Sequence, residues 1–449
     1  MSKSELITPR TLKGFRDYLP DAMVAREWLI DTAREVYRSF GFAPIDTPAL
    51  EYEEILVGKG GAESDKQLYR FTDHGGREVA LRFDLTVPFA RFSAQNIGQL
   101  GTPFKRYAIG PVWRGENTQR GRYREFIQCD FDTIGTESVV ADIETALVIT
   151  QLMERLDVGG FSVRCNNRQV LNGMLERLEL VDEQVAVLRA LDKLAKIGAD
   201  AVTEELMTVA GASAAQAREV LTLADVNGSR AQVLDELVPL VAGSETGEAG
   251  VARLAEIVGG VTAAGVAEER LLIDVSIARG LDYYTGAVFE TFLDDAPAIG
   301  SVCSGGRYDD LASLYTKQRL PGIGASLGVD RLLAALEELG RLEGRGAARP
   351  VFVPRFGGSL SDQIALAAEL RDAGFAVELY PEDRKLGAQL KYADRRGLPV
   401  AVIVGEDELA AGTCQLKDLR DGSTADVARG DALVDALRAL MSRGGMIVP

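Results

Sequence analysis

Four arginines lie close together in one polar segment of the chain, and arginine is well suited to holding phosphate groups. They are Arg114, Arg120, Arg122 and Arg124, and Glu116 and Glu125 stand beside them. A guanidinium group presents a planar fork of donors that fits phosphate and carboxylate oxygens, and such charge-assisted bonds are about twice as strong as neutral ones. The pattern favours a site that grips a polyphosphate. A hairpin with a solvated, charged rim would carry the same residues, so both interpretations stand at this point.

The segments on either side of these arginines are expected to form a β-hairpin spanning 104–135. The apolar positions are Tyr107, Ile109 and Val112 before the polar segment, and Phe126, Ile127, Phe131 and Ile134 after it. Two such runs joined by a polar, glycine-containing turn at 115–121 are typical of antiparallel strands. The hairpin would present its charges at one end.

Further polar residues stand where predicted strands end. Asp84 follows one strand and precedes a helix, so it could cap that helix or offer a carboxylate to a cationic ligand. Arg279 comes shortly before two consecutive tyrosines, Tyr283 and Tyr284. Because a buried charge must be paired, we favour a ligand-facing position for this arginine over a structural one.

Two glycine-rich segments complete the set of candidate residues. Gly305 and Gly306 would let the backbone approach a ligand closely, beside Tyr308. The segment GIGASLGVDRLL at 322–333 combines a strand of small residues, which leaves room for a flat ligand, with a helix that carries Arg331.

The chain divides into segments of different character. Its 449 residues suffice for two or three domains. Residues 171–265 are rich in Leu, Ala and Glu with helical periodicity and predict a helical insertion, and from 349 strands and helices alternate, which predicts an α/β domain around a mostly parallel sheet. Lys385, Lys391, Arg395 and Arg396 give that domain local basic character, as a solvated surface or as a contact to RNA phosphate.

Composition excludes several classes of function. The net charge of −17 disfavours general nucleic-acid binding, but residues 171–270 hold 17 acidic against 8 basic residues, so a basic face elsewhere remains open. The one histidine, His74, sits in a polar turn and predicts a solvated side chain, which disfavours Ser-His-Asp catalysis and histidine-rich metal sites. Four scattered cysteines suggest reduced thiols, and the lack of long apolar runs predicts a cytoplasmic protein with no membrane segment.

Taken together, these segments resemble the histidyl-tRNA synthetases, a family of class II aminoacyl-tRNA synthetases, along nearly the whole chain. The matching segments are KGFRDYLP, FAPIDTPALE, LRFDLTVPFARF, GRYREFIQCDFD, ARGLDYYTGAVFE, GGRYDDL and GASLGVDRLL. Any one class II motif is weakly specific, whereas RGLDYYTG with GGRYD is specific to this family. KLGAQLKYAD and VIVGEDE resemble the family's anticodon-binding domain.

The resemblance implies an α+β class II synthetase core, an antiparallel sheet flanked by helices, built from residues 1–170 and 266–340. It implies a helical insertion at 171–265 and an anticodon-binding α/β domain at 349–449. The proline-bearing segment FAPIDTPALE implies a homodimer. The implied reaction joins ATP, carrying Mg²⁺, and L-histidine into histidyl-adenylate, and then transfers histidine to the 3′ end of histidine tRNA.

The resemblance also implies roles for individual residues, and it leaves the ligands of magnesium unassigned. The catalytic cations would be Arg114, Arg279 and Arg331. ATP would be bound by Arg114, Glu116, Arg122, Phe126 and Arg331. Histidine would be held at its α-amino end by Asp84, Thr86, Gln128 and Asp132, and at its imidazole by Tyr284 and Tyr308. A site that hydrogen-bonds both ring nitrogens would reject an apolar analogue strongly.

The nearest alternative is a non-catalytic relative, the histidine-sensing regulatory subunit of ATP phosphoribosyltransferase. That family typically lacks the C-terminal domain and loses members of the catalytic set. This chain has a C-terminal α/β segment and keeps Arg114, Arg279 and Arg331. These features favour the enzyme.

Overall fold

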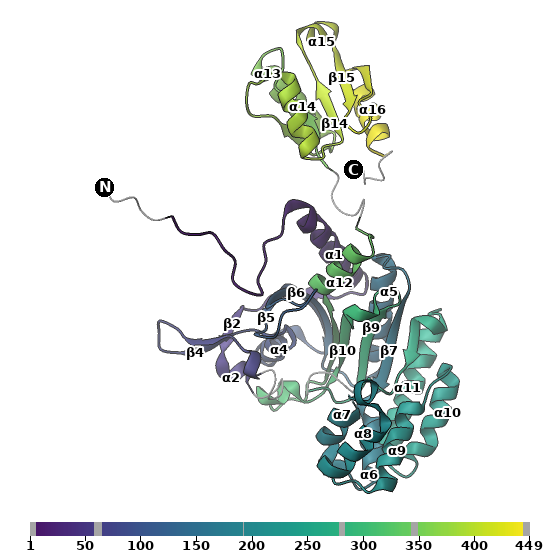
Figure 1. Ribbon diagram of the computed structural model, residues 1–449. Helices are drawn as coiled ribbons and strands as arrows, with labels where there is room; N and C mark the ends of the chain where they lie inside the picture. Colours follow the sequence, from purple (N-terminus) through teal and green to yellow (C-terminus); the bar gives the residue numbers. More distant parts are fainter. Residues whose placement is uncertain (1–5, 58–64, 192, 278–282, 343–348, 443–449) are drawn as a thin grey trace. The chain divides into compact units, whose positions relative to one another are not determined.

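The computed structural model describes residues 6–57, 65–191, 193–277, 283–342 and 349–442. The chain divides into two compact units, Met1–Arg341 and Leu342–Pro449. Figure 1 traces the elements of each unit along the chain.

An eight-stranded sheet forms the centre of the first unit, in the order β1-β5-β6-β11-β10-β9-β7-β8. Its strands are β1 (Ala43–Pro44), β5 (Phe104–Trp113), β6 (Glu125–Ile134), β7 (Phe161–Asn167), β8 (Leu271–Ile273), β9 (Ala287–Leu293), β10 (Cys303–Tyr308) and β11 (Gly322–Gly328). The six central strands pair antiparallel, and one parallel pair lies at each edge. The sheet is therefore mixed, with the expected antiparallel centre.

The predicted hairpin is strands β5 and β6, in continuous register from Phe104 opposite Ile134 to Trp113 opposite Glu125. Side chains alternate across a strand. On β6 the odd positions Cys129 and Phe131 are fully buried, and the Phe131 ring lies 5.0 Å from the ring of Tyr37 on helix α1 (Pro20–Ser39). The even positions therefore face the opposite side of the sheet.

Several helices position the ends of these strands. Helix α4 (Thr86–Leu100) follows Asp84, whose carboxylate accepts a hydrogen bond from the Val87 amide at 3.0 Å, which is the predicted capping contact. Helix α5 (Val139–Arg155) begins after Ser138, whose hydroxyl accepts from the Val140 amide. Helix α12 (Val329–Glu338) follows β11 directly and carries Arg331 in its first turn.

A three-stranded sheet lies beside the main sheet, in the order β2-β4-β3. Its elements are β2 (Leu50–Tyr52), β3 (Arg70–Thr72), β4 (Glu78–Leu81) and the short helix α2 (Glu53–Leu56). Residues 42–56 do not form one continuous strand, because Pro44 closes the edge strand β1 after two residues and Pro48 lies between β1 and β2.

The helical segment between β7 and β8 contains α6 (Arg168–Arg177), α7 (Gln184–Leu191), α8 (Leu194–Val209), α9 (Ala214–Asp225), α10 (Arg230–Val241) and α11 (Glu245–Ala263), which gather beside β7 in Figure 1. Capping boxes at Ser213 and Ser229 begin α9 and α10. Helices α6 and α11 meet at glycines. A Cβ added to Gly173 would lie 2.3 Å from the Gly247 Cα, so no larger residue fits there.

The second unit is an α/β fold with sheet order β13-β12-β14-β15-β16. Its elements are β12 (Val351–Val353), α13 (Leu360–Asp372), β13 (Val377–Leu379), α14 (Leu386–Arg395), β14 (Val400–Ile403), α15 (Glu406–Ala411), β15 (Thr413–Asp418), β16 (Thr424–Ala428) and α16 (Asp431–Ser442). Only β13, β12 and β14 are mutually parallel. The expected mostly parallel sheet was wrong for β15 and β16, because a strand pair joined by a short turn returns antiparallel.

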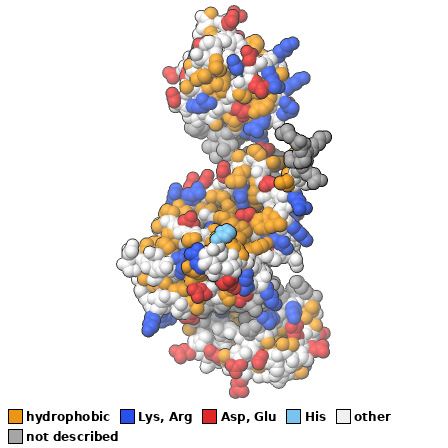
Figure 2. Space-filling model, turned by 90° about the vertical axis from the view of Figure 1, so that its left-hand side faces the viewer, with side chains coloured by type: hydrophobic (Ala, Val, Ile, Leu, Met, Phe, Trp, Pro, Cys, Tyr) orange, Lys and Arg blue, Asp and Glu red, His pale blue; other side chains and the backbone are white. Residues whose placement is uncertain are grey.

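Three smaller expectations concern surface and thiol groups. His74 is exposed in a turn, as predicted, and is visible on the surface of the molecule (Figure 2). All four cysteines are free and buried. Among the described residues, no helix is both long and apolar enough to cross a membrane.

Candidate active site

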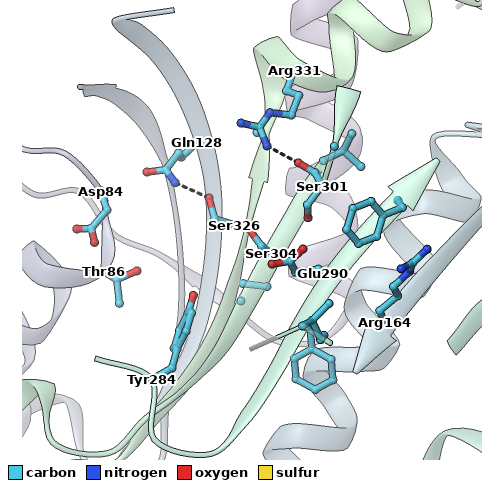
Figure 3. A pocket seen from close by; sticks show the side chains of 18 of the residues that line it. Asp84, Thr86, Gln128, Arg164, Tyr284, Glu290, Ser301, Ser304, Ser326 and Arg331 are labelled. Carbon is cyan, nitrogen blue, oxygen red and sulfur yellow. Dashed lines mark hydrogen bonds between the residues drawn. The ribbon is translucent and has the colours of Figure 1, made fainter. Parts of the chain in front are cut away.

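A cavity of about 880 Å³ opens on the main sheet, and side chains that line it are shown in Figure 3. Its β6 residues are the even positions, so it lies on the face opposite to the one that packs against α1. It is lined by eleven of the twelve expected site residues: Asp84, Thr86, Arg114, Glu116, Arg122, Phe126, Gln128, Asp132, Tyr284, Tyr308 and Arg331. The twelfth, Arg279, lies outside the described residues. Strand β6 contributes Phe126, Gln128 and Asp132 because these even positions share one face.

One end of the cavity is basic. Arg114 donates through Nε to the carbonyl of Phe83 at 2.9 Å, and its guanidinium lies 5.3 Å from the centre of the Phe126 ring. Arg331 donates through Nη1 to the carbonyl of Ser301 at 2.6 Å. The Arg122 guanidinium lies 3.9 Å from the Glu116 carboxylate. Backbone and aromatic contacts thus hold the two central cations in place.

The electrostatics at this end indicate a shortage of negative charge. Burial lowers the pKa of Arg331 to about 10, and the neighbouring Arg122 and Arg114 add to the effect, with Glu116 and Glu290 opposing it. Like charges held close together disfavour the charged form of each. A polyanion bound among these arginines would remove that penalty.

The other end of the cavity is acidic and buried. Asp132 forms an ion pair of 2.6 Å with Arg106, directly opposite it on β5, and accepts a hydrogen bond of 2.5 Å from the Tyr308 hydroxyl. Asp84 accepts from the Tyr283 hydroxyl at 3.2 Å. Burial raises the pKa values of Asp84 and Asp132, although nearby cations and hydrogen bonds oppose the shift.

Asp130 is the third carboxylate of this region, and it lies on the same face of β6 as Asp132. Asp130 is 1% exposed, and burial raises its pKa to about 7, with Arg106 opposing the shift and Asp132 adding to it. Three buried carboxyl groups, Asp84, Asp130 and Asp132, therefore stand around one fully buried guanidinium, that of Arg106. The acidic end carries more negative than positive charge, which fits a cationic ligand group.

The glycines of β10 and β11 make room for protein side chains as well as for a ligand. A Cβ on Gly324 would lie 2.2 Å from Asp132 Oδ1, and one on Gly322 would lie 2.2 Å from the Tyr308 ring. A Cβ on Gly306 would meet the Tyr284 ring at 3.0 Å. The small residues of the motif thus set the positions of the acidic and aromatic groups.

A buried carboxylate outside the cavity ties two of its walls together. Asp330 Oδ2 accepts from the Ile127 amide at 2.8 Å and from Arg26 at 3.1 Å, and its other oxygen accepts a short hydrogen bond from Tyr18. Ile127 lies between two cavity residues of β6, and Asp330 precedes Arg331. The N-terminal segment thereby fastens β6 to the start of α12.

The arginine-rich segment is divided between two roles. Arg114 and Arg122 line the cavity, whereas Arg120 pairs with Glu338 at 3.2 Å on the surface and Arg124 donates to the carbonyl of Glu116 at 3.2 Å. The segment therefore places two of its arginines at the cavity and two outside the cavity lining. Arg307, which lies between Gly306 and Tyr308, is a structural cation whose Nη2 lies 2.5 Å from the carboxylate of buried Asp142.

Sequence reasoning missed several residues of this site. Tyr283, Glu290, Ser301 and Ser304 also line the cavity. Alternation along β6 could have identified Asp130, because it shares its face with Gln128 and Asp132. Nothing local in the sequence signals Glu290 or Ser301, which reach the site only through the pairing of β9 and β10 and the loop between them.

The fold and the cavity define a class of protein. A largely antiparallel sheet, whose central hairpin and following glycine-rich strand and helix bring arginines to one pocket, is the core of a class II aminoacyl-tRNA synthetase. The family model described as histidyl-tRNA synthetase matches residues 14–332, and the model described as an anticodon binding domain matches residues 360–440. The chain belongs to the histidyl-tRNA synthetase family.

Known relatives match this chain along nearly its whole length. The histidine–tRNA ligase of Rhodopirellula baltica is 59% identical, with 97% of this chain and 100% of the relative covered. The histidine–tRNA ligase of Wolinella succinogenes is 48% identical, with 94% and 96% covered. The crystal structure of histidyl-tRNA synthetase from Nostoc sp. PCC 7120 superposes with a TM-score of 0.86 at 35% identity, with 98% and 100% covered.

Proposed function

We infer that this chain is a histidine–tRNA ligase that activates L-histidine with ATP and transfers it to the 3′ end of histidine tRNA. The observation that carries this inference is a cavity that combines a basic end suited to a polyphosphate with an acidic, tyrosine-lined end suited to a cationic amino acid. The relatives that are named for this activity match nearly the full chain. The same relatives disfavour the regulatory alternative.

In the activation step, a carboxylate oxygen of histidine attacks the α-phosphorus of ATP, and the bond to the β-phosphate breaks to release pyrophosphate. Charge shifts among phosphate oxygens, so preorganised cations contribute more than a general base. We assign Arg114 to the α-phosphate and the histidine carboxylate, and Arg331 to the γ-phosphate side. Arg279 is assigned from the family resemblance as a further catalytic cation.

The adenosine part of ATP would occupy the cavity beside the hairpin. We assign Phe126 to stack on adenine, with Glu116 and Arg122 around the nucleotide. Phe126 already packs against the Arg114 guanidinium, so one flat face remains suited to a base.

The acidic end would bind histidine. Because the buried carboxyl groups outnumber the buried guanidinium, an α-ammonium group held near Asp84, Thr86, Gln128 and Asp132 would balance the charge. The Tyr308 hydroxyl donates to Asp132, so its oxygen is left to accept a hydrogen bond from an imidazole N–H. We assign Tyr284 to the same ring.

Magnesium fits the residues at the basic end as a companion of the nucleotide. Glu116 and Glu290 both line the cavity near Arg331. Magnesium commonly binds through one or two carboxylates together with substrate phosphates, and no group of three acidic, cysteine or histidine side chains is arranged for a metal among the described residues. When bound, it would offset negative charge on the pyrophosphate that leaves.

We propose that residues 1–170 and 266–340 perform catalysis, that 171–265 form an insertion and that 349–449 bind the anticodon of the tRNA. The exposed basic residues on and beside α14, Lys385, Lys391, Arg395 and Arg396, support a contact with RNA phosphate. The four free cysteines fit a reducing cytoplasm.

We further propose a homodimer. Leu50, Tyr52 and Phe71 are each between 44% and 50% exposed on the three-stranded sheet, which places large apolar side chains on one surface next to the proline-bearing segment. Light scattering coupled to size exclusion would test this. A mass of twice 48.3 kDa is expected, and a monomer at micromolar concentration would contradict the proposal.

The proposed function is tested by charging tRNA with labelled histidine. Purified chain, ATP, magnesium and total tRNA should give histidine esterified to tRNA that accepts histidine and to no other. Failure to charge, in a sample that forms the adenylate, would contradict the transfer step.

A further inference from the structure

We propose that Asp130, acting through Ser326, fixes the orientation of the Gln128 amide so that its oxygen faces the α-ammonium group of the substrate. This inference rests on the proposed function. It makes Asp130 and Ser326 positioning residues for amino-acid binding.

The strand register brings the three side chains together. Asp130 and Gln128 share the cavity face of β6, and Asp130 lies directly opposite Ser326 on β11. Gln128 donates through Nε2 to the Ser326 hydroxyl at 2.8 Å, as Figure 3 shows. Ser326 lies opposite Asp130, and its hydroxyl favours the ionised form of that carboxyl group, so we infer that the hydroxyl points toward the carboxylate. The three side chains form a series that runs from the buried part of the sheet to the cavity.

The chemistry of these groups fixes the direction of the hydrogen bonds that link them. An ionised carboxylate only accepts hydrogen bonds, and a serine hydroxyl has one proton to donate. The Ser326 proton is therefore directed to Asp130, which leaves the Ser326 oxygen to accept from the amide nitrogen of Gln128. The amide cannot turn over without placing two acceptors face to face.

The series of three residues ends at the cavity in a hydrogen-bond acceptor, the amide oxygen of Gln128. Gln128 Oε1 is buried and accepts no hydrogen bond from the part of the chain that the structure describes. A buried acceptor without a donor is costly, so such an atom is expected to meet a ligand donor. In a cavity whose acidic end suits a cationic group, that donor is an ammonium N–H.

The surroundings of Asp130 suit this role. Arg106 on β5 attracts its negative charge, whereas Asp132 on β6 and Asp84 before α4 repel it. Burial raises the pKa of Asp130 to about 7, and a bound ammonium group would favour the ionised form. The direction of the hydrogen bonds holds for the ionised form of Asp130, so the test is made above this pKa.

A purely structural role for Asp130, as a partner of Arg106, is the competing explanation. It predicts general loss of stability and equal weakening of all ligands. The proposed role predicts a selective effect on ligands that carry the ammonium group.

Asp130→Asn, Ser326→Ala and the double variant would test the proposal in histidine-dependent exchange of pyrophosphate into ATP. Each single variant should raise the KM for histidine by about tenfold, the loss of one charge-assisted hydrogen bond, with the KM for ATP unchanged. The double variant should be no worse than Ser326→Ala, because both changes break the same series of hydrogen bonds. Ser326→Thr, which keeps a hydroxyl, should retain most of the affinity.

The deciding ligand is imidazole propionate, which is histidine without the amino group. Its inhibition constant should not change in the variants. Ser162→Ala, which removes another buried hydroxyl of the same sheet on β7 and lies outside the cavity lining, should leave every constant unchanged.

Equal loss of affinity for histidine and for imidazole propionate, or additive effects in the double variant, would overturn the inference and leave the proposed function intact. Ser326→Ala is a small change at a half-buried site, so it remains informative if Asp130→Asn does not fold. A wild-type chain without exchange would refute the proposed function and this inference with it.

Discussion

At the scale of single residues, the basic end of the cavity depends on arginines whose positions are fixed before a ligand arrives. Arg114 and Arg331 each donate one hydrogen bond to a backbone carbonyl, which leaves their other nitrogens for the proposed contacts with the nucleotide. Preorganised donors of this kind do not need to reorganise during the reaction, and this is the source of their effect on rate.

Arg279→Ala should slow adenylate formation by roughly two orders of magnitude or more, because one preorganised donor to a developing charge is worth about 3 kcal/mol. Single-turnover measurement of adenylate formation would show this. Arg319→Ala provides the control, since Arg319 is 74% exposed in a surface ion pair with Glu137. A near-normal rate in the Arg279 variant would remove the role assigned to it.

Asp130 also links stability to pH. Its pKa is raised to about 7 by burial, so between about pH 4 and 7 the folded state holds a proton that the unfolded state releases. The carboxyl group therefore opposes folding increasingly as pH rises through this window. In urea unfolding, the free energy of unfolding of Asp130→Asn should increase relative to that of wild type by a few kcal/mol between pH 4 and 8, which is the order of magnitude that such a pKa shift sets. A constant difference across this range would contradict the assignment of the shift.

At the scale of elements, the strand pairing of β6, β11 and β10 determines which side chains meet in the cavity. Gly324 lies opposite Asp132, and its missing side chain is what lets that carboxylate stand over the strand. The placement of the acidic groups is therefore a property of the paired strands.

Gly324→Ala should destabilise the protein by about 1–3 kcal/mol, because the new Cβ would lie 2.2 Å from Asp132 Oδ1 and 2.3 Å from the Phe131 carbonyl. It should also raise the KM for histidine by moving Asp132. Gly328→Ala on the same strand is the matched control for stability, since its nearest atoms would be 3.7 Å away. Equal unfolding free energies for the two variants would refute the steric argument.

The elements themselves were largely predictable. Apolar periodicity predicted the central hairpin, the helical segment that follows β7 and the alternating strands and helices of the second unit. Composition could not show how Pro44 and Pro48 divide the segment FAPIDTPALE, or that β15 and β16 return antiparallel.

The contacts that hold the site were not predictable from spacing. The Ile127 amide and Asp330 are 203 residues apart, and Arg307 and Asp142 are 165 apart. Partners so distant in sequence have no local pattern, because they meet only after the sheet has formed. The family resemblance supplied most of the site residues for that reason, and it did not supply Asp130 or Ser326.

At the scale of the whole molecule, we assign catalysis to the first unit and binding of the tRNA anticodon to the second. Deleting residues from Arg349 onward should reduce aminoacylation of tRNA far more than it reduces adenylate formation, because the cavity lies entirely in the first unit. Both activities should be measured on a truncated chain whose circular dichroism shows a folded core. Equal loss in both assays with a folded core would remove the anticodon-binding role.

The most direct test of the central claim is exchange of labelled pyrophosphate into ATP, with histidine, with each other amino acid in turn, and without tRNA. The account predicts exchange with histidine alone, since only this amino acid combines the ammonium group with an imidazole, the ring that Tyr284 and Tyr308 are proposed to recognise. Absence of exchange from a protein that still binds histidine would contradict it, and would favour the regulatory relative despite the C-terminal domain.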